Sequence, residues 1–91
     1  MLLVCEEGTF HLSRPLYPFA RHPIGVGDLL SATMLANLLA GCTPVAAFEL
    51  TNASVDAVLA RTWLAGAYEL QLVAAQHEMA LPQVSIRATR L

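Results

Sequence analysis

Residues 29–48 read LLSATMLANLLAGCTPVAAF, a run of twenty residues without a charged side chain. Such a run is long enough for one helix to cross a bilayer. Gly41, Thr43 and Pro44 divide it, because glycine stops helices, threonine caps helix starts and proline fits the first helical turn. The run therefore predicts two consecutive helices of a protein core, in preference to one membrane-spanning helix.

The flanking sequence predicts a third helix and a surrounded first one. The first helix is expected over residues 29–40, with apolar residues on nearly every face, which is typical of a helix enclosed by other elements. The second is expected from Thr43 to about Thr62, and the third over residues 68–79, ended by Pro82. Three apolar residues at helical spacing are expected to lie in the core: Trp63, Phe48 and Met34.

The residues before the helices predict a hairpin and a loop. Residues 2–5 and 9–13 have the pattern of two short strands joined by a turn. Residues 14–23 contain three prolines, so we expect an ordered loop there and no helix before Ile24. Residues 84–91 are expected to be extended. The order of two strands, a loop and three helices, without repeats or linkers, predicts one segment of an α/β fold.

The composition is unusually apolar for a chain of 91 residues. Apolar side chains make up 56% of the sequence and charged ones 13%, and the mean hydropathy is +0.55. Soluble domains carry about 25% charged residues, and a small domain leaves much of its surface in water. We therefore expect apolar faces of this chain to meet a partner, lipid or a further part of the polypeptide.

Charge and cysteine content exclude other classes. The net charge is −2 and lysine is absent, so no basic stripe is available for nucleic acid. Cys5 and Cys42 lack metal-binding spacing and are expected to be buried, reduced thiols. The histidines show no metal spacing either. The first residues do not resemble a signal peptide, and we expect a cytoplasmic protein without a membrane partner.

Gly25-Val26-Gly27-Asp28 precedes the first helix and is the strongest candidate for a functional site. Glycines allow close approach of a ligand to backbone N–H groups, and a helix start favours an anion. Asp28 could then accept a proton from a hydroxyl that attacks a phosphate. The same four residues also fit an ordinary helix start capped by aspartate. They match neither the dinucleotide motif nor the P-loop.

Four stretches together closely resemble the C-terminal part of the ribokinase-like kinases and, within them, the bacterial pyridoxal kinases. They are residues 14–17 (RPLY), 22–32 (HPIGVGDLLSA), 68–76 (YELQLVAAQ) and 88–91 (ATRL). The resemblance implies the C-terminal portion of a three-layer α/β/α fold. It also implies that residues 1–91 are a single segment, and we expect a fragment of a longer kinase domain.

The resemblance further implies the reaction and its residues. Asp28 would be the base that takes the proton from the 5'-hydroxymethyl group of pyridoxal, pyridoxine or pyridoxamine, and would hold that hydroxyl. The anion hole for the γ-phosphoryl group would comprise Gly25, Val26 and Gly27. The ATP-binding residues would be Arg14, Pro15, Leu16 and Tyr17. The family implies ATP and Mg²⁺, a role in vitamin B6 salvage and a homodimer; the sequence identifies no Mg²⁺ ligands here.

Three alternatives remain at this stage. The motif fits a ribokinase-like kinase of another small molecule equally well. The second alternative is a catalytically incomplete segment that only folds against, or interacts with, a partner chain. An intramembrane aspartyl protease also uses Gly-x-Gly-Asp, but its second aspartate could only be Asp56, on the interrupted second helix.

Asn52 is expected to be a hydrogen-bonded core residue in preference to a nucleotide ligand.

Overall fold

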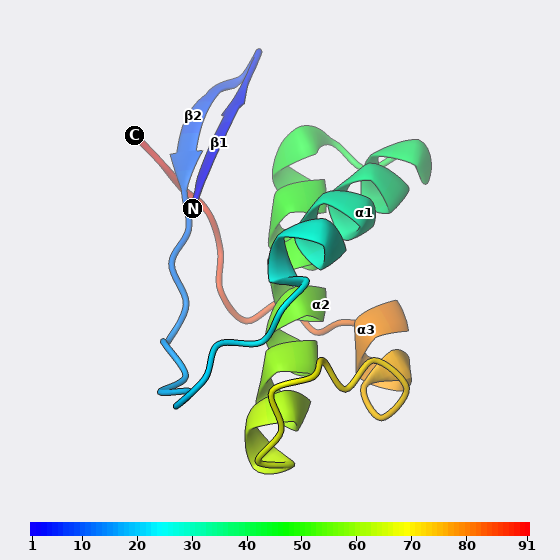
Figure 1. Cartoon of the computed structure of the whole chain (residues 1–91). Helices are drawn as coiled ribbons and strands as arrows, with labels where there is room; N and C mark the ends of the chain where they lie inside the picture. The colour runs from blue at the N-terminus through cyan, green and yellow to red at the C-terminus, as the bar shows by residue number, and fades with distance from the viewer.

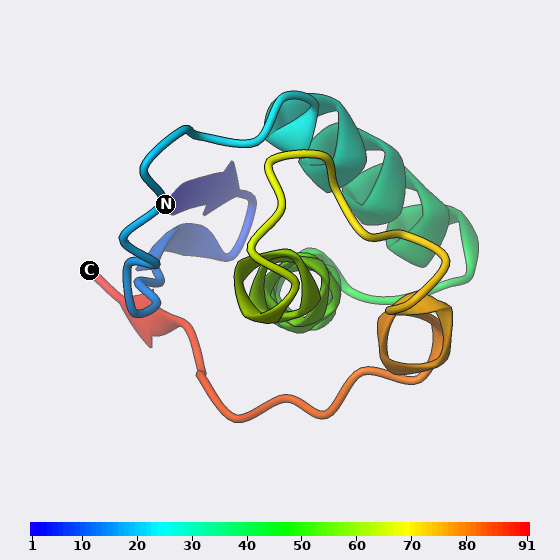
Figure 2. The ribbon, with the colours of Figure 1, turned by 60° about the horizontal axis from the view of Figure 1, so that its bottom comes forward.

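One long helix, α2 (Pro44–Leu64), runs through the middle of the structure, and the other elements are arranged around it (Figures 1 and 2). The computed structural model describes all residues, 1–91. The other elements are β1 (Leu2–Cys5), β2 (Gly8–His11), α1 (Val26–Leu39), α3 (Gln76–Ala80) and β3 (Thr89–Arg90). The fold is therefore mixed α/β, as predicted.

The strands form a small antiparallel sheet in the order β1-β2-β3. In the hairpin, Leu2 is opposite His11 and Cys5 is opposite Gly8, which confirms the two predicted strands. The extended C-terminal residues return to this sheet, where Arg90 of β3 is opposite Phe10 of β2. The sequence predicted an extended tail but not its pairing partner. Strand β1 lies at an edge of the sheet.

The break between α1 and α2 is the one that the sequence predicts. Gly41 has φ +98°, a left-handed conformation that glycine adopts without steric cost. Thr43 caps α2, with its Oγ1 accepting a hydrogen bond from the Ala46 N–H (3.3 Å), and Pro44 is the first helical residue. No helix has both the length and the apolar character needed to cross a membrane.

The core is built almost entirely on α2. Ten of the 13 buried residues belong to this helix, including Phe48, Val55 and Val58. By contrast, α1 contains no buried residue, and Leu39 is 79% exposed. Within these residues α1 is therefore not the enclosed helix that its sequence suggests. The expectation that apolar faces remain uncovered is confirmed.

The third predicted helix is largely wrong. Only Gln76–Ala80 is helical, whereas residues 68–75 form bends and turns. Two interactions oppose a helix there: Ile24 forms a parallel bridge with Glu69, and the Gln71 N–H donates to Thr62 Oγ1 (3.1 Å). Both hold the backbone away from helical hydrogen bonding. Local spacing of apolar residues cannot reveal such long-range competition.

Two of the three expected core side chains also need correction. Trp63 is 41% exposed, whereas Phe48 is buried as predicted, and Met34 is only partly buried. Cys5 and Cys42 are free thiols, as predicted, but both are half-buried instead of buried. Trp63 lies near the end of α2, where only a loop covers it.

Removing the buried leucine at the end of the hairpin should destabilise the fold. Leu12 is 1% exposed, so Leu12→Ala should lower the free energy of unfolding by about 2–5 kcal/mol through lost burial and a cavity. Leu39→Ala is the matched control and should change it by less than about 0.5 kcal/mol. Urea unfolding at low protein concentration measures both; equal effects would contradict the assignment of the core.

Candidate functional site

The glycine turn before α1 is formed by a left-handed Gly25. Its φ is +96°, and it is the N-cap of α1, which begins at Val26. This corrects the sequence interpretation of Asp28 as the first or capping residue. Asp28 is the third residue of the helix, makes no capping hydrogen bond and is exposed. The reason is the glycine conformation, which lets the Gly25 carbonyl accept the first helical hydrogen bond.

Three backbone donors at this turn have no partner within the helix. The first helical bond runs from the Leu29 N–H to the Gly25 carbonyl (2.9 Å), so the amides of Val26, Gly27 and Asp28 precede it. They point out of the positive end of the α1 dipole, which favours an anion. The turn thus has the chemistry of an oxyanion or phosphate site.

Gly27 lies next to open space. A Cβ built on it would meet no atom within 4 Å, and its φ is not positive. Packing within this chain therefore does not require glycine at position 27. Alanine would also make the helix more stable than glycine does. An approaching ligand would use the space that a Cβ would fill.

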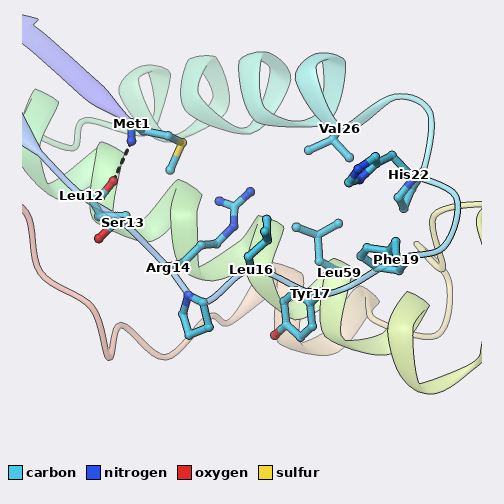
Figure 3. Close-up of a pocket in the computed structure, with 12 residues that line it drawn as sticks. Met1, Leu12, Ser13, Arg14, Leu16, Tyr17, Phe19, His22, Val26 and Leu59 are labelled. Carbon is cyan, nitrogen blue, oxygen red and sulfur yellow. Dashed lines mark hydrogen bonds between the residues drawn. The ribbon is translucent and has the colours of Figure 1, made fainter.

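A pocket of about 440 Å³ lies beside this turn (Figure 3). Its walls come from the loop, from the residues before the glycine turn and from two helices: Arg14, Pro15, Leu16, Tyr17, Phe19, His22, Pro23, Val26 and Leu59 are among them. The structure thus brings all four predicted ATP-binding residues and one predicted anion-hole residue, Val26, to one cavity. Gly25, Gly27 and Asp28 do not line it.

The loop that forms one wall is attached to α2. Arg14 Nη1 donates to Asn52 Oδ1 (2.9 Å), and the Tyr17 hydroxyl donates to Asp56 Oδ2 (3.4 Å). Asn52 is 2% exposed, which confirms the hydrogen-bonded core asparagine. The sequence analysis did not assign Asp56 to this site. The four-residue spacing of Asn52 and Asp56, which puts both on one helix face, is the signal that was available.

The electrostatics of the loop centre on Tyr17. Burial first, and then the neighbouring Asp56 carboxylate, raise the pKa of the Tyr17 hydroxyl, whereas Arg14 opposes the shift. The hydroxyl therefore remains a hydrogen-bond donor at neutral pH. No group of three or more His, Cys, Asp or Glu side chains is arranged to hold a metal ion.

The chain is similar over its whole length to part of a group of curated bacterial kinases. These relatives carry the name pyridoxal kinase PdxY. The protein of Aliivibrio fischeri is 52% identical over 93 residues, covering 100% of this chain and 32% of that protein. The proteins of Paraburkholderia xenovorans (57% over 83 residues, 91% and 29%) and Pseudomonas fluorescens Pf0-1 (54% over 89 residues, 98% and 31%) are similar in the same way.

These similarities confirm the resemblance to bacterial pyridoxal kinases. No family model matches the chain. The chain spans about a third of the length of the curated relatives it matches.

Loss of the Tyr17 hydroxyl proton should make the fold less stable at alkaline pH. Because its folded pKa is raised, the folded chain holds this proton more tightly than the unfolded chain. The stabilising contribution is complete below the unfolded pKa of about 10 and is lost as pH rises through the higher folded pKa. Urea unfolding between about pH 8 and 11 should show a smaller loss for Tyr17→Phe than for wild type. Tyr68→Phe is the control; equal losses in wild type and Tyr17→Phe would contradict the assignment.

Gly27→Ala should stabilise the isolated chain and fill the open space beside Gly27. The added methyl group meets open space and improves helix propensity, so the free energy of unfolding should rise by up to about 1 kcal/mol. Gly25→Ala should lower it, because a side chain is strained at φ +96°. Thermal unfolding measures both variants, and a destabilised Gly27→Ala would contradict the open geometry.

Proposed function

We propose that this chain is the catalytic-base and anion-binding segment of a pyridoxal kinase. The reaction would transfer the γ-phosphoryl group of ATP to the 5'-hydroxymethyl group of pyridoxal, pyridoxine or pyridoxamine in vitamin B6 salvage. The observation that carries the proposal is the turn at residues 25–28, with three unpartnered amides beside a pocket, in a chain similar throughout to pyridoxal kinases.

The pocket suits one end of a nucleotide. Arg14 and His22 are basic residues among its walls, and Pro15 and Leu16 add apolar surface. Its volume of about 440 Å³ lies within the usual size of small-molecule sites. Val26 joins this pocket to the glycine turn, so a nucleotide in the pocket would direct its phosphates toward the start of α1.

Asp28 would act as the general base. Its carboxylate is exposed and free of hydrogen bonds, so it is available to a hydroxyl. As the substrate oxygen attacks the γ-phosphorus, the new O–P bond forms and the bond to the bridging oxygen of ADP breaks. Asp28 receives the hydroxyl proton, and ADP leaves with the bond electrons.

The backbone at residues 25–28 would stabilise the transferred group. The amides of Val26, Gly27 and Asp28 would donate hydrogen bonds to equatorial oxygens, and Gly25 would set their direction through its left-handed conformation. Preorganised donors of this kind need no rearrangement during the reaction.

Magnesium does not fit the residues of this chain. Phosphoryl transfer from ATP normally needs metal ions at the β- and γ-phosphates. Only two aspartates are present, and no acidic group is arranged to hold a metal.

The rest of the kinase fold would cover the uncovered faces of this chain. The relatives are about three times as long, whereas α1 has no buried residue and β1 is an edge strand. We propose that these surfaces pack inside a three-layer α/β/α domain of the ribokinase-like type. A cytoplasmic location remains a prediction from the cysteines and the first residues, and a homodimer remains a prediction from the resemblance. The chain alone is expected to be inactive.

A chimera tests the proposed reaction. This chain replaces the matched third of the Aliivibrio fischeri kinase, and formation of pyridoxal 5'-phosphate from pyridoxal and ATP is measured. The chimera should be active, and Asp28→Asn should lower kcat by about 10²- to 10⁴-fold with little change in ATP affinity.

The exposed Glu6→Gln in the hairpin turn is the control and should retain activity. A second chimera on the Paraburkholderia xenovorans protein guards against a mismatch in one host. Undiminished turnover of Asp28→Asn would remove Asp28 from the mechanism. Folded, ATP-binding chimeras without activity in both hosts would contradict the proposed function.

A further inference from the structure

Three contacts attach the loop at residues 14–19 to one face of α2. Arg14 bonds to Asn52 and Tyr17 to Asp56, and the ring of Phe19 packs edge-on against Trp63 with centroids 5.5 Å apart. The three α2 residues are four and seven positions apart, so they lie along one stripe of the helix. Loop and helix run side by side in the same chain direction.

Leu59 lies in the same stripe and belongs to the pocket. It falls between Asp56 and Trp63, is 7% exposed and lines the cavity that the loop walls off (Figure 3). The helix face that holds the loop therefore also forms part of the pocket surface. Moving the loop along or away from α2 changes the shape of this cavity.

Both polar contacts of the loop with α2 are partly buried. Asn52 is buried, and its Oδ1 accepts from a charged guanidinium, which makes a stronger bond than a neutral donor. Asp56 uses Oδ2 for Tyr17, while its Oδ1 is buried without a partner. Burying a carboxylate oxygen without a partner costs free energy, so the Tyr17 bond is the side-chain hydrogen bond that compensates Asp56.

We propose that Asn52 and Asp56 are positioning residues that hold Arg14 and Tyr17 and so set the nucleotide-facing wall of the pocket. The inference rests on the proposed function for the identity of the ligand, ATP. The attachment of the loop itself does not depend on that function. Arg14 and Tyr17 form the wall, and α2 fixes where it stands.

Trp63 provides a direct readout of this attachment. It is the only tryptophan of the chain, and its ring contacts Phe19 of the loop. Release of the loop should therefore increase quenching of its fluorescence by acrylamide. Hydrogen exchange at the Phe19 amide of the loop, which donates to the Tyr17 carbonyl (2.8 Å), reports on the same event without any ligand.

The test uses Asn52→Leu and Asp56→Leu in the full chain. Leucine is close in size to both residues, keeps helix propensity and removes the acceptor. Each variant should speed exchange of the Phe19 amide about tenfold and increase quenching of Trp63. Ser54→Ala is the matched control: Ser54 is buried on α2 but donates to the Met79 carbonyl (2.8 Å), away from the loop. It should leave both readouts unchanged.

Kinetics of the chimera then separate positioning from simple stability. Both leucine variants should raise KM for ATP about tenfold, with KM for pyridoxal and kcat nearly unchanged, and Asn52→Asp and Asp56→Glu should restore part of the affinity. Where a leucine variant does not fold, Tyr17→Phe removes the same bond from the loop side and should speed loop exchange.

The outcomes are distinct for the two proposals. Unchanged loop exchange in Asn52→Leu, Asp56→Leu and Tyr17→Phe overturns the attachment. Faster exchange with unchanged KM for ATP overturns the positioning role. Wild-type chimeras that fold in both hosts but do not bind ATP overturn the proposed function, while loop exchange in the chain still decides whether α2 holds the loop.

Discussion

The burial of α2 is the constraint on which the rest of the structure depends. Ten of the 13 buried residues lie on this helix, and the hairpin, α1 and α3 each pack against it. A helix that is surrounded must satisfy its polar residues locally. Asn52 and one carboxylate oxygen of Asp56 do so through the loop, Ser54 through Met79, and Thr62 through its own helix and Gln71. The connections around α2 are therefore fixed by the hydrogen-bonding needs of α2.

The same constraint places the candidate site. The loop at residues 14–23 cannot become a helix, because its prolines forbid it, and α2 supplies the partners that order it. The loop is followed by Gly25, whose left-handed conformation starts α1. A pocket remains between loop and helices, with the free amides of the first α1 turn beside it. Loop, turn and pocket are thus consequences of one packing arrangement.

Features that depend on neighbouring residues could be predicted from the sequence. The hairpin and the cap at Thr43 follow from turn and capping chemistry, whereas α1 begins at Val26, three residues before the expected Leu29. The helix expected over residues 68–79 was wrong, because the bridge to Ile24 and the bond to Thr62 come from distant parts of the chain. The partners of Arg14 and Tyr17 lie 38 and 39 residues away, so local pattern could not identify them. The motif at residues 25–28 could be recognised, but not its relation to the pocket.

The central claim is that the glycine turn and the loop at residues 14–17 form one nucleotide site. Amide NMR spectra of the full chain, titrated with ATP, test it most directly, because they detect weak binding residue by residue. One shared site should give concerted shifts of the Val26, Gly27 and Asp28 amides and of the Leu16 and Tyr17 amides, with one dissociation constant. Shifts confined to one of the two segments, or absent from both at saturating ATP, would contradict it.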